Sequence, residues 1–449
     1  MTNRMTRREY LKSTAAAAGA LTILPAGLAR GYAANEKVNV GIIGSGGRGR
    51  ANLGGVGGQK DAVHIAALCD VDRGGLDGAA RQFPDARKYT DFRELITQEK
   101  DLDAVVVSTP DHCHAPASVM AMKRGLHCYC EKPLTYTVRE ARLMTEVAAE
   151  KKLATHMGTP SRGHEGTVRA AEVIRSGAIG EVKEAHFWTN RPIWPQGFDR
   201  PPGKDPVPDS LDWNLWIGPA PMRPFVATWP EGHPVYQSQW KQRQVYHPFV
   251  WRGWWDFGTG ALGDIAPHMW SPAYWGLDLD APQSVEIVET SGPVTEMFPA
   301  ATVLRFNFPA RSDRPPVAVY WYDGGKRPSP ELVGMQDVPD GGQLIVGSKA
   351  VLGTGNKSAD AAEFASVPKT FQRWGDMYQE WIAGIRQSDP NRPSCPFSYC
   401  GPMTEAYLLG NIALKVGQRI EWDPKAMRIT NCERANQYLH REYRQGWEL

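Results

Sequence analysis

Several features are missing from this sequence of 449 residues, and each absence removes a class of function. The formal net charge is +2 and no block of basic residues stands out, so we predict no nucleic-acid partner. No apolar run reaches the ~20 residues that a membrane-spanning helix requires, which predicts no span in the mature protein. Long polar tracts and low-complexity repeats are missing as well, and this favours an ordinary folded protein.

The cysteines show no pairing pattern. There are seven, an odd count without the C-x-x-C pairs of a zinc site, so we predict no disulfide framework. Cys128 and Cys130 alternate on an expected strand and are explained best as small buried side chains. The cluster Asp111-His112-Cys113-His114 has no second group of ligands at a useful spacing, so no metal site is predicted.

The first residues are typical of an export signal. The paired arginines Arg7 and Arg8 precede a short apolar stretch from Ala15 to Leu24, and small residues follow near Ala33. This order predicts a twin-arginine signal peptide over residues 1–33 and export to the periplasm of a protein that folds before it crosses the membrane. The alternative is an amphipathic helix that belongs to the mature fold.

A dinucleotide-binding pattern follows the signal. The apolar run Val38 to Ile43 suits a buried parallel strand, and it leads directly into a glycine-rich turn. A second apolar run ends at Asp70, about 20 residues past the turn, where a carboxylate binds the adenosine ribose. This carboxylate would repel a 2′-phosphate, so NAD is the predicted cofactor and NADP the less favoured one. The expected pyrophosphate-binding residues are Gly44, Gly46, Gly47 and Gly49.

Two further segments stand where this kind of fold binds ligands. Alternating strands and helices predict a βαβ series, and Thr109-Pro110 and Glu131-Lys132-Pro133 each follow a strand directly. The expected organisation is a Rossmann domain over residues 36–158 and a second domain over residues 159–449. A chain of this length exceeds the roughly 250–300 residues at which single cores stop growing.

The sequence resembles the glucose-fructose oxidoreductase, inositol dehydrogenase and rhizopine catabolism family, called Gfo/Idh/MocA. The glycine turn, Glu131-Lys132-Pro133 and the segment Gly263 to His268 carry the resemblance, in that order along the chain. It implies an α/β protein with an N-terminal Rossmann domain and a C-terminal domain built on a large, mostly antiparallel sheet. Ala266 departs from the family pattern, which often has glycine there.

The resemblance also implies roles for individual residues. Lys132 matches the lysine near the nicotinamide, Asp264 a substrate-orienting aspartate and His268 a proton-transferring histidine. Cofactor contacts are implied for Thr109, Pro110, His114, Glu131 and Lys132. These residue types suit the reaction. Removing hydride from a carbinol carbon requires a base such as histidine at the hydroxyl, and a cation next to the same oxygen stabilises the developing alkoxide.

The middle of the chain is rich in tryptophan. Eleven of the sixteen tryptophans lie between Trp188 and Trp275, in a segment without simple periodicity. Flat aromatic faces next to hydrogen-bonding groups suit sugar rings, although most of these side chains are expected to be structural. The candidate substrate contacts are Arg191, Trp194 and His247.

Three functions fit these observations. The first is an oxidoreductase that moves hydride between a nicotinamide cofactor and a hydroxyl or keto group of a sugar, polyol or glycoside. The second is an NAD-dependent glycosidase or lyase that acts by transient oxidation and elimination. The third is a non-catalytic dinucleotide- or sugar-binding protein. A homo-oligomer is expected from the resemblance alone.

Overall fold

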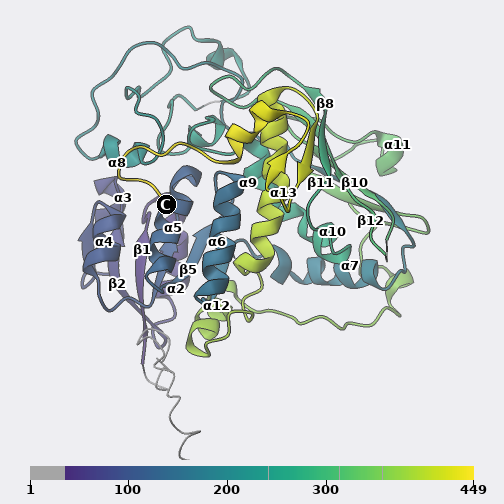
Figure 1. The fold of residues 1–449 in the computed structure, drawn as a ribbon, viewed down its shortest axis with the longest axis horizontal. Helices are drawn as coiled ribbons and strands as arrows, with labels where there is room; N and C mark the ends of the chain where they lie inside the picture. The colour runs from purple at the N-terminus through teal and green to yellow at the C-terminus, as the bar shows by residue number, and fades with distance from the viewer. Residues whose placement is uncertain (1–35, 241, 313, 356) are drawn as a thin grey trace, which may run out of the picture.

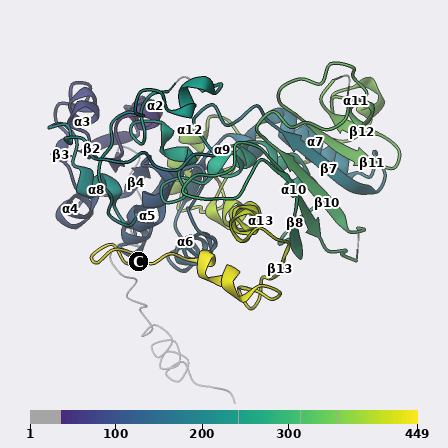
Figure 2. The ribbon, with the colours of Figure 1, turned by 90° about the horizontal axis from the view of Figure 1, so that it is seen from above.

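A computed structural model describes residues 36–449 apart from 241, 313 and 356. The predicted signal at residues 1–33 lies outside this part of the chain. Two sheets organise the described residues, a parallel sheet with its helices and a larger twisted sheet beside it (Figure 1). Figure 2 shows α13 (Phe397–Val416) between them, where it packs against both α6 (Val138–Glu150) of the first unit and β8 (Ser284–Thr290) of the second.

The first sheet has six parallel strands in the order β3-β2-β1-β4-β5-β6. The strands β2 and β3 lie on one side of β1, and the strands from β4 to β6 lie on the other. This switch in strand order between β1 and β4 creates the crevice where doubly wound sheets bind ligands. The strands are β1 (Val38–Ile43), β2 (Val63–Cys69), β3 (Arg87–Tyr89), β4 (Ala104–Val107), β5 (His127–Glu131) and β6 (Thr155–Gly158). All four residues of β4 are buried, as expected for a strand covered on both faces.

Helices cover both faces of this sheet. Those that follow the strands are α2 (Gly47–Gly57), α3 (Arg73–Ala80), α4 (Phe92–Gln98), α5 (His114–Lys123) and α6 (Val138–Glu150). Another cover comes from the far end of the sequence, because α12 (Met377–Arg386) returns and packs against α2, β1 and β6. The Trp381 indole of α12 is fully buried and donates a hydrogen bond to the Ala154 carbonyl at 3.1 Å.

The second sheet has eight strands in the order β12-β11-β7-β10-β9-β8-β13-β14. Its neighbours are antiparallel except for β7 and β10, which run parallel. The strands are β7 (Val182–Trp188), β8 (Ser284–Thr290), β9 (Thr302–Phe308), β10 (Val317–Tyr322), β11 (Gly342–Gly347), β12 (Val351–Gly353), β13 (Ile420–Asp423) and β14 (Arg428–Ile429). The inward side chains share one core with α13 and with α7 (Glu165–Arg175), α9 (Gly260–Met269) and α10 (Ser271–Gly276). The short α11 (Pro330–Val333) covers Trp188 on the other face.

The starts of two helices in the C-terminal part of the chain differ. Helix α12 begins at Met377, where the Asp376 carboxylate caps the first turn by accepting from the backbone of Tyr378 and Gln379. Helix α13 begins at Phe397 without a side-chain cap and contains Pro402. Pro402 lies in the second turn of the helix and removes one N–H from the helical hydrogen-bond ladder.

The tryptophan-rich segment forms an irregular layer above the carboxyl ends of the parallel strands (Figure 1). It contains the short α8 (Trp213–Ile217) and has an aromatic core of its own. This layer is bonded to the loop after β2, since Asp212 N–H donates to the Val71 carbonyl and Arg73 N–H to the Ser210 carbonyl. The C-terminal tail adds another link, with Arg444 bonded to the Gly218 carbonyl and Trp447 against Phe92. The layer is therefore anchored to the Rossmann domain itself.

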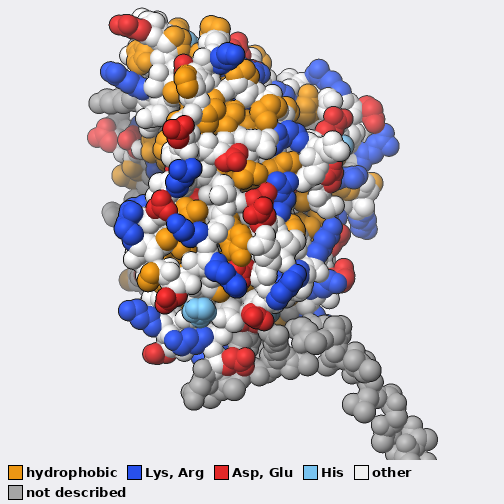
Figure 3. All heavy atoms as spheres, turned by 90° about the vertical axis from the view of Figure 1, so that its left-hand side faces the viewer, with side chains coloured by type: hydrophobic (Ala, Val, Ile, Leu, Met, Phe, Trp, Pro, Cys, Tyr) orange, Lys and Arg blue, Asp and Glu red, His pale blue; other side chains and the backbone are white. Residues whose placement is uncertain are grey.

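Charges of both signs are interspersed on the face shown in Figure 3. This face has no extended patch of a single charge sign. Within the described part of the chain, none of the helices combines the length and the apolar character that crossing a bilayer requires.

Candidate active site

A cavity of about 450 Å³ lies between the carboxyl ends of the parallel strands and the tryptophan-rich layer. One wall is the glycine turn after β1, and the opposite wall is the stretch from His247 to Arg252. The segments predicted to bind the cofactor meet here, because the cavity is lined by Gly44, Gly46, Gly47, Asp70, Thr109, Pro110, Glu131 and Lys132. Gly49 and His114 lie behind this lining.

The glycine turn fits a pyrophosphate. Gly44 has a φ of +80°, and a Cβ there would lie 2.7 Å from the Ser108 backbone. A Cβ on Gly49 would lie 1.7 Å from the Gly44 carbonyl oxygen, so the close packing of turn and helix requires glycine. A Cβ on Gly47, with a φ of +47°, would meet nothing within 4 Å. The turn thus presents open backbone at the start of α2, where N–H groups and the helix dipole bind anions.

Asp70 occupies the place expected for a ribose-binding carboxylate. Its Oδ2 accepts from the Gly46 N–H at 2.8 Å and its Oδ1 from the Asp72 N–H at 2.9 Å, so the carboxylate also braces the glycine turn. Burial raises the pKa of Asp70, and these backbone donors oppose that rise. Arg73, the cation that could accommodate a 2′-phosphate, does not line the cavity. This arrangement favours NAD.

Lys132 and Asp264 form the central ion pair of the site. Lys132 lies on the turn between β5 and α6, preceding a cis peptide bond to Pro133. Its Nζ donates to the Asp264 Oδ1 at 2.6 Å and to the Asp264 carbonyl at 2.9 Å. Although burial opposes the shift, Lys132 and then Arg252 lower the pKa of Asp264 to about 2, so this carboxylate is ionised at neutral pH. Two motifs 132 residues apart are thereby joined in one site.

His268 lies one helical turn after Asp264 on α9, as the spacing predicted. Its ring is solvent-accessible, and Nδ1 is 2.9 Å from the Thr159 Oγ1, directly after β6. The pKa of His268 is lowered by the protein that crowds the ring and by the Lys132 charge, so the imidazole is neutral at pH 7. His268 does not line the cavity itself but adjoins the ion pair at its edge.

Glu131 supports this arrangement from behind. Its Oε1 accepts from Arg48 Nε at 2.9 Å and from Asn52 Nδ2 at 3.0 Å, and the Tyr378 hydroxyl donates to the Asn52 side chain at 2.9 Å. The returning helix α12 is therefore connected through Tyr378 to the residue next to Lys132. Sequence reasoning did not identify this connection, because Tyr378 and Asn52 are 326 residues apart.

The two histidines of the Asp111 to His114 cluster connect loops around the site. His114 bonds the Pro133 and Thr109 carbonyls with its two ring nitrogens, and His112 bonds those of Phe257 and Trp216. His114 thus fixes two cavity-lining loops without contacting the cavity. Within residues 36–449, apart from 241, 313 and 356, no group of three His, Cys, Asp or Glu side chains is arranged to hold a metal. All seven cysteines are free and buried.

The expected substrate contacts need correction. Trp194 is 1% exposed and bonded to Gln196, and Arg191 bonds the neighbouring Asn190 side chain; neither lines the cavity. His247 does line it, but its Nε2 is 3.0 Å from the Asp72 carboxylate, near the ribose end. Arg252, which the sequence left unassigned, lies at the ion pair instead, with Nε 3.3 Å from Asp264 Oδ1. Aromatic composition could identify the layer but not the side chain that turns inward.

Thr159 provides a first test of the site. The Thr159 hydroxyl is fully buried, and accepting the Nδ1–H of His268 would leave Nε2 free to act as a base. We expect Thr159→Val to lower kcat by about tenfold to a hundredfold with little change in KM, since loss of an orienting partner has effects of this size. Thr159→Ser should restore activity. An equal loss in both variants would contradict the role of the hydroxyl.

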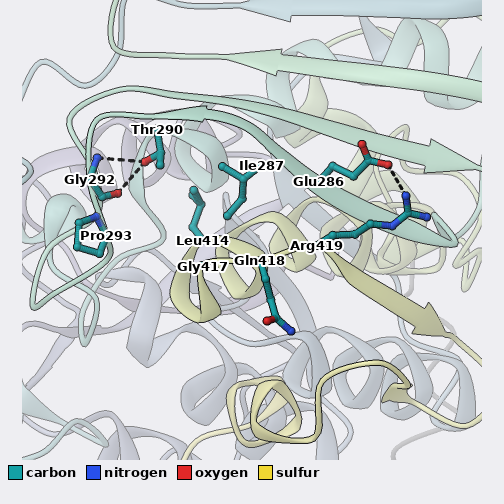
Figure 4. Close-up of a pocket in the computed structure, with 9 residues that line it drawn as sticks. All are labelled: Glu286, Ile287, Thr290, Gly292, Pro293, Leu414, Gly417, Gln418 and Arg419. Atoms are coloured by element: carbon teal, nitrogen blue, oxygen red, sulfur yellow. Dashed lines mark hydrogen bonds and ion pairs between the residues drawn. The ribbon is translucent and has the colours of Figure 1, made fainter.

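A separate hollow lies between β8 and the end of α13 (Figure 4). Arg419 pairs with Glu286 at 2.8 Å on one side, and Thr290 bonds the Gly292 backbone on the other. The close-up shows no group of catalytic side chains converging on a common point. We therefore assign the chemistry to the cavity at the glycine turn.

Comparison with known proteins agrees with this geometry. Residues 38–159 match the model of the Gfo/Idh/MocA oxidoreductase family described as its NAD-binding Rossmann fold, and residues 193–297 match that of its C-terminal alpha/beta domain. An inositol 2-dehydrogenase of Salmonella typhimurium is 28% identical over 151 residues, which are 33% of this chain and 45% of that protein. A glycosyl hydrolase family 109 protein of Shewanella is 31% identical over 157 residues, 33% of this chain and 34% of that protein. The chain thus spans less than half the length of these curated relatives.

Solved structures share the fold along most of the chain. The WlbA dehydrogenase from Bordetella pertussis, in complex with NADH and UDP-GlcNAcA, has a TM-score of 0.57 at 15% identity, covering 86% of this chain and 99% of its own. The myo-inositol dehydrogenase from Lactobacillus casei, in complex with NAD(H) and myo-inositol, has a TM-score of 0.54 at 18% identity, covering 86% and 97%. These neighbours have the two-sheet architecture found here. The two family models together cover about half of the sequence, and the chain belongs to the Gfo/Idh/MocA family of oxidoreductases.

Proposed function

We propose that this protein is an NAD-dependent oxidoreductase that oxidises a hydroxyl of a sugar, polyol or glycoside, or reduces the corresponding keto group. The observation that carries the proposal is the Lys132–Asp264 ion pair at the edge of the glycine-turn cavity, with the neutral His268 one turn away. The relatives named as an inositol dehydrogenase and a family 109 glycosyl hydrolase support a polyol or sugar substrate.

Each of the three side chains has a task in this reaction. His268 takes the hydroxyl proton on Nε2, which is free when Nδ1–H donates to Thr159. The Lys132 ammonium stabilises the developing alkoxide, and Asp264 holds that ammonium in place through two hydrogen bonds. NAD, when bound on the glycine turn, supplies the hydride acceptor. Gly44, Gly46, Gly47 and Asp70 would hold it, with Thr109, Pro110 and Glu131 along its path.

The anchored tryptophan-rich layer favours a cofactor that stays bound between turnovers. The layer forms the wall of the cavity opposite the glycine turn and is bonded to the loop after β2, so a bound dinucleotide would lie between two anchored walls. Retention would suit the second candidate function, a glycosidase that oxidises its substrate transiently, eliminates the aglycone, adds water to the resulting double bond and then returns the hydride. Both reactions use the same base and the same cation.

Two finer statements complete the proposal. Export to the periplasm by the twin-arginine route rests on Arg7, Arg8 and the apolar stretch after them, and an exported enzyme has no large pool of free NAD. Cell fractionation tests this export. Association into a homo-oligomer is a second expectation, and the molecular mass in solution tests it.

Absorbance of the reduced cofactor separates the candidate functions. The purified protein is incubated with NAD and a panel of polyols, aldoses and p-nitrophenyl glycosides. Stoichiometric growth of reduced-cofactor absorbance would establish the dehydrogenase, whereas release of p-nitrophenol without net reduction would establish the glycosidase. Cofactor binding with neither signal, across a panel that reaches millimolar concentrations, would contradict both enzymatic assignments.

A further inference from the structure

Arg252 lies at the substrate end of the cavity and is held in a fixed position. Its guanidinium stacks on the Trp251 ring at 4.2 Å and on the Phe249 ring at 4.5 Å. Nε donates to the Asp264 Oδ1, and Nη1 donates to the Phe249 carbonyl at 3.0 Å. The side chain is 19% exposed and lines the cavity together with Lys132. This long side chain is thus ordered before any ligand binds, so binding need not include the entropy cost of fixing its conformation.

The hydrogen-bonding capacity of this guanidinium is incompletely used. Nε and Nη1 have partners, but Nη2 makes no hydrogen bond to any residue in the described part of the chain. A guanidinium presents paired N–H groups that match the two oxygens of a carboxylate or the oxygens of a phosphate or sulfate. The unused Nη2 donors are therefore available to an anionic ligand in the cavity.

The charge balance at this end of the cavity also favours an anion. Lys132 and Arg252 share a single acceptor, Asp264 Oδ1, at 2.6 Å and 3.3 Å. Asp111 is close by, but burial raises its pKa to about 7 against the opposing charge of Arg252, so it contributes only part of a negative charge. The neighbouring carboxylate Glu131 is already paired with Arg48. Two cations therefore face little more than one carboxylate in a site largely shielded from solvent.

We propose that Arg252 is a specificity-determining residue that binds an anionic substituent of the substrate, so that the preferred sugar carries a carboxylate, phosphate or sulfate group. This inference rests on the proposed function, because it places the substrate hydroxyl at Lys132 and His268. Binding the acidic group at Arg252 fixes the ring, and the neighbouring hydroxyl then meets the base. A neutral sugar would leave the guanidinium without this partner and would bind more weakly.

Matched pairs of acidic and neutral sugars test the inference. The NAD-loaded protein is titrated by calorimetry at pH 6, below the pKa of about 7 of Asp111, with D-glucuronate and D-glucose, and with D-galacturonate and D-galactose. We expect the acid to bind at least tenfold more tightly than its neutral partner, the effect of one charge-assisted hydrogen-bonded pair. Arg252→Gln should weaken binding of the acid by at least tenfold more than binding of its neutral partner, and Arg252→Lys should restore part of the preference.

Turnover of the same sugar pairs distinguishes a failure of the anion site from a failure of the proposed oxidoreductase function. Arg252-dependent binding of the acid without reduced cofactor or released product would support the anion site and contradict the proposed reaction. Turnover of neutral sugars without an acid preference would support the reaction and overturn the anion site. Equal weakening of both sugars by Arg252→Gln, or no binding of either acid by the wild-type protein, would also overturn it. Circular dichroism of each variant verifies that the protein is folded.

Discussion

Replacing His268 with alanine is expected to lower kcat by about 10²–10⁴-fold, the usual contribution of a positioned base. The substrate hydroxyl would lose its proton acceptor, while the ion pair of Lys132 and Asp264 and the glycine turn would remain intact. Cofactor affinity should therefore be unchanged within about twofold, as measured by fluorescence titration with NADH. Initial rates of cofactor reduction at saturating sugar provide the value of kcat.

The pH dependence of the same variant makes the test more specific. The pKa of His268 is lowered to about 4 by crowding and by the Lys132 charge, so the ring stays in the neutral, active form until the pH falls to about 4. The wild type should show an acid limb of kcat/KM near pH 4, and His268→Ala should lack it. His64→Ala, an exposed histidine on β2, is the matched control and should behave as the wild type. An unchanged acid limb in His268→Ala would assign the titration to another group.

The Rossmann half of the fold could be predicted closely from the sequence. The apolar runs at 63–69 and 104–107 coincide with β2 and β4, because strands buried on both faces read as continuous apolar segments. The glycine turn was identifiable for a similar reason, since close backbone approaches admit no side chain. These are local constraints, and each is visible within a few neighbouring residues.

Contacts between distant segments were not predictable in this way. Thr159 and Arg252 each approach a catalytic candidate only because separate elements meet above the sheet, and nothing in their own neighbourhoods indicates it. The tryptophan-rich layer illustrates the same limit. Its composition indicated aromatic packing, but which ring is buried and which lines the cavity depends on the tertiary arrangement of an irregular segment without periodicity. That Lys132 and Asp264 lie in one site could be predicted, because the family resemblance assigned a role to each of them.

Replacing Lys132 with methionine is expected to lower kcat by about 10²–10³-fold, because the alkoxide that forms as the proton leaves would lose its principal cation. Methionine keeps the length and the apolar stem, so the cis turn before Pro133 and the start of α6 should be preserved. Lys123→Met, an exposed lysine at the end of α5, is the matched control. Reduced-cofactor absorbance at saturating substrate measures the effect.

The Asp264→Asn variant shows whether the pair acts as a unit. Asp264 has its pKa lowered by Lys132 and Arg252, and its carboxylate holds the lysine ammonium at 2.6 Å, so removing either member disables the same interaction. The double variant Lys132→Met/Asp264→Asn should therefore be little slower than Lys132→Met alone, because the losses of kcat from two residues that act as one unit are strongly non-additive. Fully multiplicative losses would mean that Asp264 contacts the substrate independently. In that case, the Asp264 carboxylate would bind the substrate directly, and Arg252 would hold this carboxylate in position.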